Sequence, residues 1–286
     1  MNPVVAVIAP GMMGAAVGKR LVDHGIKVLT SIEGRSAGTR ERAKVAGMAG
    51  ASDDEIATSD FILSILPPGD AVALAQRFVP ALTASNSKPV YVDCNAVSPP
   101  TVERIAAAIA PTGSPFVDAG IIGSPPKPND AGPRFYASGP QAHRFAKLKE
   151  FGLDVRVLDG PMTAASALKM SYAGITKGTQ ALGAAMLLAA TRGGTADALF
   201  AELSGSQPQI LAWLKRNLAL MPPKAYRWVA EMHEIAAFVG EDPSAHELYL
   251  GAAHFYERIA RDFEADKKEV AAIEAFMSKQ QVGSSS

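Results

Sequence analysis

The chain has 286 residues, of which 48% are hydrophobic, which is enough for one large domain or two ordinary ones with a sizeable core. Lysine and arginine equal aspartate and glutamate in number, so the net charge is near zero. This balance argues against a general binder of nucleic acid or other polyanions, although it allows a local basic site for one phosphate group. The single cysteine, Cys94, excludes an intrachain disulfide, fits a reducing compartment and is expected to be a small core residue.

The N-terminal stretch predicts a dinucleotide-binding βα unit. A β-branched run over residues 4–8 predicts a buried strand, and a helical pattern follows the turn at residues 9–14. In this turn, Gly11 lets the backbone approach a pyrophosphate and Gly14 lets the helix pack closely on the strand, while the first helical N–H groups face the phosphate. Ala9 departs from the pattern because it replaces the first glycine of G-x-G-x-x-G. The residues expected to contact the cofactor here are Gly11, Met12, Met13 and Gly14.

The stretch after the second strand, expected over residues 26–31, indicates which cofactor is preferred. In a dinucleotide-binding fold, the end of this strand meets the adenosine ribose. An NAD site places an acidic side chain there, whereas hydroxyls and a guanidinium fit the 2′-phosphate of NADP. The arginine and the hydroxyl residues in this stretch lead us to expect NADP. We keep NAD as possible because Glu33 is compatible with ribose hydroxyls. The residues expected at the 2′-phosphate are Ser31, Arg35, Ser36 and Thr39.

Strands and helices then alternate as far as residue 158, which predicts a parallel, doubly wound sheet of the α/β class. The expected strands span residues 61–66, 90–93, 116–119, 134–138 and 155–158. The expected helices span residues 40–46, 70–82, 102–110 and 141–151. Ser52, followed by three acidic residues, is expected to cap a further short helix.

From residue 162 on, no convincing strand is found and the sequence predicts helices alone. A long helical pattern over residues 162–192 comes first. Further helices are expected over residues 196–203, 209–220, 226–239, 246–263 and 267–279. We therefore expect a Rossmann-type domain over residues 1–160 and an all-helical substrate and dimerisation domain over residues 161–280, entered by a long interdomain helix. Residues 281–286 are expected to be a disordered tail.

The sequence carries no apparent signal for export or for membrane insertion. No charged region precedes the first strand, and the longest apolar stretch, over residues 181–190, is too short to span a bilayer. We therefore expect a cytoplasmic protein that takes a small-molecule substrate, without membrane or nucleic-acid partners and without a metal site. A helical domain rich in Ala and Leu exposes much apolar surface when alone, so a homodimer with this domain at its interface is expected.

Taken together, these features resemble the β-hydroxyacid dehydrogenase family, which contains 3-hydroxyisobutyrate dehydrogenase and, more distantly, 6-phosphogluconate dehydrogenase and the imine reductases. The resemblance follows nearly the whole chain in order. Residues 11–14 look like the family's G-x-M-G turn, and Leu66-Pro67 stands at the end of a strand where the family contacts the cofactor. Residues 92–99 are similar to the family's D-x-S-T-x-x-P, and Asn95, in place of the serine, is expected to contact the nicotinamide or the substrate.

The segment over residues 118–124, D-A-G-I-I-G-S, resembles the family's D-A-P-V-S-G-G. In the family, the serine hydroxyl and the glycine amide of this motif hold the substrate carboxylate. Here Ile122 stands in place of that serine, while the N–H of Gly123 stays available. Isoleucine cannot donate a hydrogen bond and would desolvate a carboxylate without compensation, so the resemblance implies a substrate more apolar than a small 3-hydroxy acid.

Lys169 on the long helix matches the catalytic lysine of the family. The resemblance implies that it takes the hydroxyl proton as hydride leaves carbon, or returns a proton in the direction of reduction. The family's asparagine one turn later is Ala173 here, so Tyr172 or Thr176 on the same helix face is expected to supply the polar contact. The residues expected at the substrate are Ile122, Gly123, Tyr172, Ala173 and His233, the last from a stretch that marks one branch of the family.

Three functions are open at this point. The resemblance implies an NADP-dependent dehydrogenase or reductase that acts on a hydroxyl–carbonyl pair. Asn95 and Ile122 depart from the acid-binding pattern and leave an imine reductase or reductive aminase open, although Lys169 favours carbonyl chemistry because those enzymes often have Asp or Tyr there. Ala9 and the lost polar positions leave open a nucleotide-binding regulator without turnover.

Overall fold

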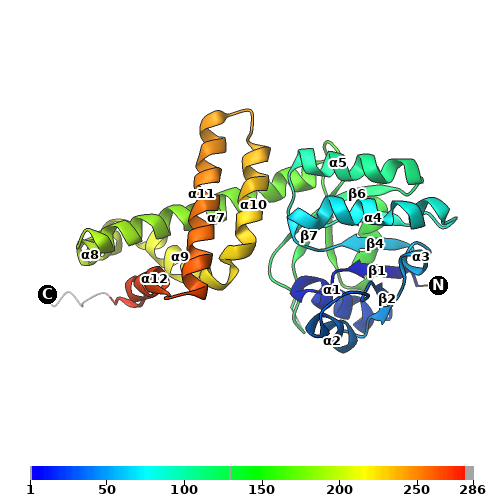
Figure 1. Cartoon of the computed structure of the whole chain (residues 1–286), viewed down its shortest axis with the longest axis horizontal. Helices are drawn as coiled ribbons and strands as arrows, with labels where there is room; N and C mark the ends of the chain where they lie inside the picture. The colour runs from blue at the N-terminus through cyan, green and yellow to red at the C-terminus, as the bar shows by residue number, and fades with distance from the viewer. Residues whose placement is uncertain (1, 129, 281–286) are drawn as a thin grey trace. The chain divides into compact units, whose positions relative to one another are not determined.

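The computed structural model describes residues 2–128 and 130–280, and it divides into two compact units (Figure 1). One unit runs up to Met170 and the other begins at Ser171, so the division falls inside helix α7 (Ala164–Arg192). The sequence places the boundary earlier, at residue 160; the first turns of α7 account for the difference because they pack on the sheet of the first unit. The expected tail, residues 281–286, lies outside the described residues.

The first unit is built on an eight-stranded sheet in the order β3-β2-β1-β4-β5-β6-β7-β8. All neighbouring strands run parallel except β6 and β7. The strands are β1 (Val4–Ile8), β2 (Lys27–Thr30), β3 (Ala49–Gly50), β4 (Phe61–Ser64), β5 (Val90–Asp93), β6 (Phe116–Ile122), β7 (Arg134–Ser138) and β8 (Asp154–Val157). The strand order reverses between β1 and β4, which is where doubly wound sheets bind ligands, and the α/β prediction is confirmed.

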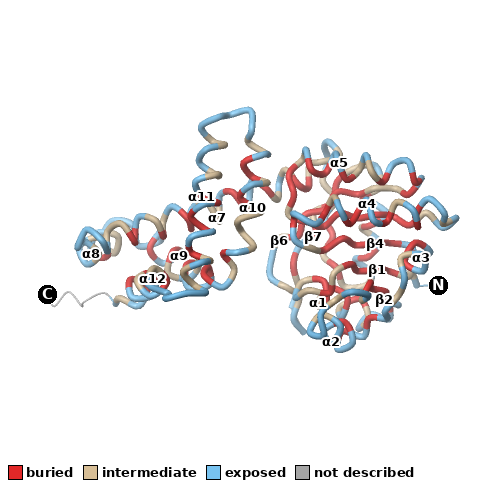
Figure 2. Tube along the Cα trace, viewed as in Figure 1, coloured by how far each residue is buried: buried red, intermediate tan, exposed pale blue. Residues whose placement is uncertain are grey.

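Helices cover both faces of this sheet, and each face has its own apolar core. One core is formed with side chains from α1 (Met12–Asp23), α2 (Ala37–Val45), α6 (Ala142–Phe145) and the 3₁₀ helix η3 (Ala146–Phe151). The other is formed with α3 (Asp53–Ile56), α4 (Ala71–Ala84) and α5 (Pro99–Ile109). Short 3₁₀ helices η1 (Pro68–Asp70) and η2 (Ala110–Thr112) precede α4 and follow α5. The buried segments follow the strands, as Figure 2 shows, so the carboxyl ends of the strands are held on a rigid base.

The structure differs from the sequence prediction in several parts of this unit, and it adds the two-residue strand β3, which was not expected. Strand β6 continues past residue 119 because β7 runs antiparallel beside it and pairs with it through Ile122. A run that contains Gly120 is a weak strand signal by itself, so the sequence did not predict that β6 extends to Ile122. The helix expected over residues 141–151 forms as one turn of α6 and then tightens into η3.

The second unit continues α7 and adds only helices within the described part of the chain, which confirms the all-helical prediction. These are α8 (Ala196–Ser206), α9 (Pro208–Leu218), η4 (Pro222–Lys224), α10 (Ala225–Phe238), α11 (Pro243–Glu264) and α12 (Lys268–Ser278). Helix α11 begins before the expected residue 246 because Asp242 caps it, accepting from the N–H groups of Ser244 (2.9 Å) and Ala245 (3.1 Å). Among the described helices, none combines the length and the apolar character that crossing a bilayer requires.

Candidate functional site

The turn between β1 and α1 is tight at one glycine and open at the other. A Cβ on Gly14 would overlap the carbonyl oxygen of Ala9, so the fold itself requires a glycine there. A Cβ on Gly11 would meet no atom within 4 Å, and its φ of −68° suits any residue. Neither packing nor conformation within the described residues explains this glycine, whereas a ligand that approaches the backbone from outside explains it.

The start of α1 fits an anion. Within the described residues, Gly11 gives α1 no side-chain cap and the first turn holds no acidic residue, so the first N–H groups are open to a negatively charged partner. Ala9, in the same turn, has a φ of 65° and so adopts the left-handed conformation. Glycine usually occupies this conformation, which costs an alanine about 1 kcal/mol. These features fit the pyrophosphate of a dinucleotide.

The predicted 2′-phosphate residues gather at the start of α2. Ser36 caps this helix: its Oγ accepts from the N–H of Thr39 at 3.3 Å and lies 3.0 Å from the Thr39 Oγ1. Arg42, which the sequence analysis missed, donates to the Thr39 Oγ1 (2.9 Å) and to the carbonyl of Pro10 (3.2 Å), and so ties α2 to the β1 turn. The guanidinium of Arg35 makes no hydrogen bond or ion pair with any residue that the structure describes, and it fits a phosphate from outside the chain.

Ser31 occupies a different environment from the one expected. It is buried at the end of β2, and its Oγ accepts a hydrogen bond of 2.8 Å from Arg77 on α4. The same guanidinium binds both carboxylate oxygens of Asp53, at 2.7 and 2.8 Å. The Ser31 hydroxyl is therefore directed into the protein, while Arg35, Ser36 and Thr39 lie nearer the surface.

Asn95 also points into the protein. Its Nδ2 donates to the Ser64 Oγ (2.8 Å) and to a carboxylate oxygen of Asp93, and its Oδ1 accepts from the N–H of Leu66 (2.8 Å). The residue is 2% exposed. Its carboxamide thus joins the carboxyl ends of β4 and β5 and holds the Leu66-Pro67 turn, and a direct contact of this group with nicotinamide stays a prediction.

A row of buried polar side chains crosses the sheet beside Asn95. Ser64, Asp93, Asp118 and Ser138 are register partners on β4 to β7 and are completely buried. Burial, and then the nearby charge of Asp118, raise the pKa of Asp93 to about 8, so this carboxyl keeps its proton at neutral pH. Burial also raises the pKa of Asp118, to about 6, against the hydrogen bonds that favour its charged form.

Lys169 lies at the carboxyl end of β6. Its Nζ donates to the carbonyl of Ile121 at 2.8 Å, and its side chain is half-buried. Helix α7 comes this close because a Cβ on Gly120 would stand only 3.0 Å from both the Ala165 carbonyl oxygen and the Lys169 Cβ. Gly123, two residues beyond Ile121, has a φ of 134° that favours glycine. The first unit thus brings Lys169 next to the strand end that carries the predicted Ile122 and Gly123.

The other predicted substrate residues belong to the second unit. Tyr172 is half exposed, Ala173 is buried, and the Thr176 hydroxyl donates to the Tyr172 carbonyl at 2.8 Å within α7. His233 is exposed on α10. Their contact with substrate stays a prediction.

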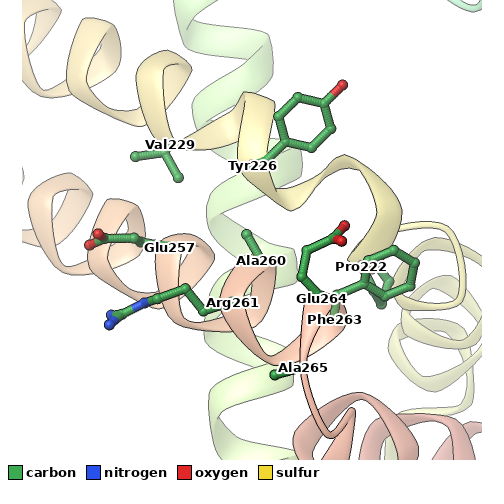
Figure 3. A pocket seen from close by; sticks show the side chains of 9 residues that line it. All are labelled: Pro222, Tyr226, Val229, Glu257, Ala260, Arg261, Phe263, Glu264 and Ala265. Carbon is green, nitrogen blue, oxygen red and sulfur yellow. The ribbon is translucent and has the colours of Figure 1, made fainter.

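The second unit has a groove of its own that contains none of the predicted site residues. It has a volume of about 700 Å³ and is lined by α10, α11 and the chain around them (Figure 3). Its lining includes Tyr226 and Val229 from α10 and Glu257, Arg261 and Glu264 from α11. Because none of the residues predicted at the cofactor or at the substrate lines this groove, we do not place the chemistry there.

Sequence comparison assigns both parts of the chain to known domains. Residues 4–151, about half of the chain, match the NAD binding domain of 6-phosphogluconate dehydrogenase. Residues 190–259 match a domain of unknown function, DUF1932. An uncharacterized 28.5 kDa protein of Methanothermus fervidus is 31% identical over 159 residues, which are 55% of this chain and 59% of that protein. The chain thus covers less than two thirds of the length of this curated relative.

Solved structures match nearly the whole chain. The conserved protein MTH1747, of unknown function and structurally similar to 3-hydroxyacid dehydrogenases, is 30% identical with a TM-score of 0.67. The match covers 91% of this chain and 97% of that one. The 3-hydroxyisobutyrate dehydrogenase of Mycobacterium tuberculosis, solved with L-serine, is 21% identical with a TM-score of 0.69 over 96% of this chain and 99% of that one, which shows a shared fold.

Proposed function

This chain belongs to the β-hydroxyacid dehydrogenase family, with a helical C-terminal domain, and we propose that it works as an NADPH-preferring oxidoreductase on a hydroxyl–carbonyl pair. Lys169 is the general acid and base of this proposal. The observation that carries it is the placement of the Lys169 ammonium at the carboxyl end of β6, in the same unit as an NAD-binding turn. The cytoplasmic location also stays a prediction.

The residues around the β1 turn support a nicotinamide cofactor. Gly11 and the open start of α1 would hold the pyrophosphate, and the Leu66-Pro67 turn is the expected neighbour further along the cofactor. Arg35, Ser36 and Thr39 support the preference for NADPH, because a guanidinium and hydroxyls at one helix start suit a 2′-phosphate. When bound, the nicotinamide supplies or accepts the hydride.

In this proposal, Lys169 donates or accepts the proton of the reaction. In reduction, its ammonium donates a proton to the carbonyl oxygen of the substrate and stabilises the charge that develops there. In oxidation, the neutral amine takes the hydroxyl proton. The bond to the Ile121 carbonyl holds Nζ in one place, which lowers the entropy cost of each transfer.

Ile122 favours an apolar substrate. It is the last residue of β6 and is partly exposed, so an apolar side chain occupies the position at which relatives hold a carboxylate. Binding a carboxylate against it would remove water without offering a donor in return. We therefore propose ketones or aldehydes without a neighbouring carboxylate as the substrate class. Cyclic imines are the alternative, because they too need no side-chain donor for a carboxylate at this position.

The experiment is a fluorescence titration of the purified protein with NADPH and NADH, followed by a screen of ketones, aldehydes and cyclic imines. We expect tight NADPH and weak NADH, and turnover that Lys169→Ala abolishes while cofactor affinity is kept. Arg35→Ala should reduce the preference for NADPH by tenfold or more, the equivalent of about 1.4 kcal/mol, whereas Arg104→Ala on α5 should leave it unchanged. Binding of neither cofactor would overturn the proposal and favour a regulator or another ligand.

The second unit supports a homodimer. On α7, Tyr172, Ile175, Leu182 and Met186 follow one another at helical spacing and are 50, 71, 63 and 55% exposed. A groove of about 500 Å³ lies beside them against α11. Covering an apolar face of this length removes it from water, and a second copy of the chain brings an identical face.

A further inference from the structure

The first turn of α7 is fastened to the sheet by buried side chains of β6 and β7. The Asp118 Oδ1 accepts from the Ser166 hydroxyl (2.6 Å), and its Oδ2 accepts from the Ser166 N–H (2.8 Å). The Ser138 Oγ accepts from the N–H of Ala165 (2.9 Å) and lies 2.8 Å from the Met162 carbonyl oxygen, to which it donates. Asp118, Ser138 and Ser166 are all completely buried, so these bonds operate without competition from water.

Asp118 acts at the end of α7 where a negative charge is most effective. The positive end of the helix dipole lies at the first turn, and α7 has no acidic residue of its own there among the described residues. The strand therefore supplies the anion that the helix lacks. Bonds to a carboxylate are shorter and stronger than neutral ones, in agreement with the 2.6 Å between Asp118 and Ser166.

The same strand also sets the position of Lys169. Lys169 follows Ser166 by one helical turn and lies on the same face of α7. Gly120, two residues after Asp118, lets this face lie directly on β6, with the Lys169 Cβ 3.0 Å from the position of an added Cβ. The Lys169 Nζ then reaches the carbonyl of Ile121 at 2.8 Å. Alternate positions of one strand therefore hold successive turns of one helix.

We propose that Asp118, acting through Ser166, is a positioning residue for Lys169, a role that rests on the proposed function above. The Asp118 carboxylate accepts two hydrogen bonds from Ser166, one from its backbone N–H and one from its hydroxyl, and together they prevent the first turn of α7 from rotating or sliding on β6. The ammonium group one turn later is held at the strand end as a result. Proton transfer needs this precision, because a displacement of 1 Å at a reacting group costs about 100-fold in rate.

The test follows Lys169 itself, so that it does not depend on turnover. The whole protein is labelled with ε-¹³C-lysine, and the Lys169 signal is identified by its loss in Lys169→Arg. We compare Ser166→Ala, which deletes the hydroxyl donor, with Ser166→Thr, which keeps it, and with Asp118→Asn. The Lys169 signal should shift in Ser166→Ala and Asp118→Asn and return toward its wild-type position in Ser166→Thr. The signal of Lys177, on the same helix but bound to Glu231, should stay unchanged.

A kinetic measurement adds a readout that loss of stability alone would not give. Ser166→Ala should lower kcat about tenfold while the NADPH dissociation constant stays within twofold of wild type, and Ser166→Thr should recover most of the loss. A Lys169 signal at its wild-type position in both Ser166→Ala and Asp118→Asn would overturn the proposal, and Ser166→Ala alone decides it if Asp118→Asn does not fold. If the signal shifts as expected but the wild-type protein turns over no substrate, the proposed function fails and the positioning role stands.

Discussion

Gly11 and Gly14 stand three residues apart in one turn, yet the packing of the protein itself requires a glycine only at Gly14. Gly14 faces the backbone of Ala9, whereas Gly11 faces open space. The sequence could predict both glycines because their spacing is a local pattern. It could not predict that Asn95 and Ser31 point inward, because Ser64 and Arg77, their hydrogen-bond partners, are distant in the chain and meet them only through the register of the sheet and the packing of α4.

Gly11→Ala should therefore separate binding from stability. The added methyl group contacts no protein atom, so the melting temperature of the free protein should stay within about 2 °C of wild type, while NADPH affinity should fall at least tenfold because the pyrophosphate can no longer approach. Gly14→Ala should instead lower the free energy of unfolding by about 1–3 kcal/mol or more. Thermal unfolding and fluorescence titration measure both effects.

Gly205→Ala, in open space on α8, is the control for these measurements. Unchanged NADPH affinity in Gly11→Ala would contradict the assignment of this turn to the pyrophosphate.

Asp93 should make stability depend on pH. An unfolded aspartate ionises near pH 4, whereas burial raises the pKa of Asp93 to about 8. Between these values the folded state holds a proton that the unfolded state has lost, so the free energy of unfolding falls as pH rises, by up to about 1.4 kcal/mol per pH unit from this group, and the loss is complete above pH 8. Asp93→Asn does not ionise and should lack this loss.

Urea unfolding of wild type and Asp93→Asn at pH 5, 7 and 9 measures the difference. The free energy of unfolding of Asp93→Asn minus that of the wild type should rise from pH 5 to pH 9. Asp118, with a pKa of about 6, contributes to both proteins below pH 6, and Tyr91 and Cys94, whose pKa values burial raises, stay neutral in this range. Parallel pH curves for the two proteins would mean that Asp93 titrates in the folded state as it does in the unfolded one.

Among the elements, α7 shows most plainly what periodicity can and cannot predict. The helical pattern indicated one long helix, and one long helix forms. The pattern did not distinguish the turns that pack on β6 from those that begin the second unit, because Ala and Ser suit both environments. The deciding residue, Gly120, lies on another element, and the strand that carries it was expected to end before it.

The exposed face of α7 in the second unit should hold a dimer together. Ile175→Asp combined with Leu182→Asp places two charges on this face, and burying them against a second copy would cost several kcal/mol. Light scattering should report a dimer for the wild type and a monomer for this variant. Ile210→Asp, at a similarly exposed apolar residue on α9, is the matched control and should leave the dimer intact. A monomeric wild type would contradict the proposed interface.

On the scale of the whole molecule, the α/β unit and the all-helical unit could be predicted from the sequence, and parts of the candidate site could be predicted as well. Alternation of strands and helices indicated the first unit, and the absence of strand patterns indicated the second. The cofactor turn and the role of Lys169 are predicted from local motifs and from the family resemblance, and they stay predictions. The hydrogen bonds that hold the first turn of α7 on the sheet could not be predicted. Asp118, Ser138 and Ser166 lie on three different elements and meet only after the chain folds.

The proton that Asp93 retains has a consequence for the electrophoretic behaviour of the protein. The sequence balances 28 acidic against 28 basic residues and has an isoelectric point near 7.0, a calculation in which every carboxylate is ionised. With Asp93 neutral in the folded state, the native protein carries one negative charge fewer at pH 7 than the unfolded chain. It should therefore focus at a higher pH in a native gel than in urea, and Asp93→Asn should narrow that gap. A buried carboxyl group thus becomes visible as migration in an electric field, without any ligand or substrate.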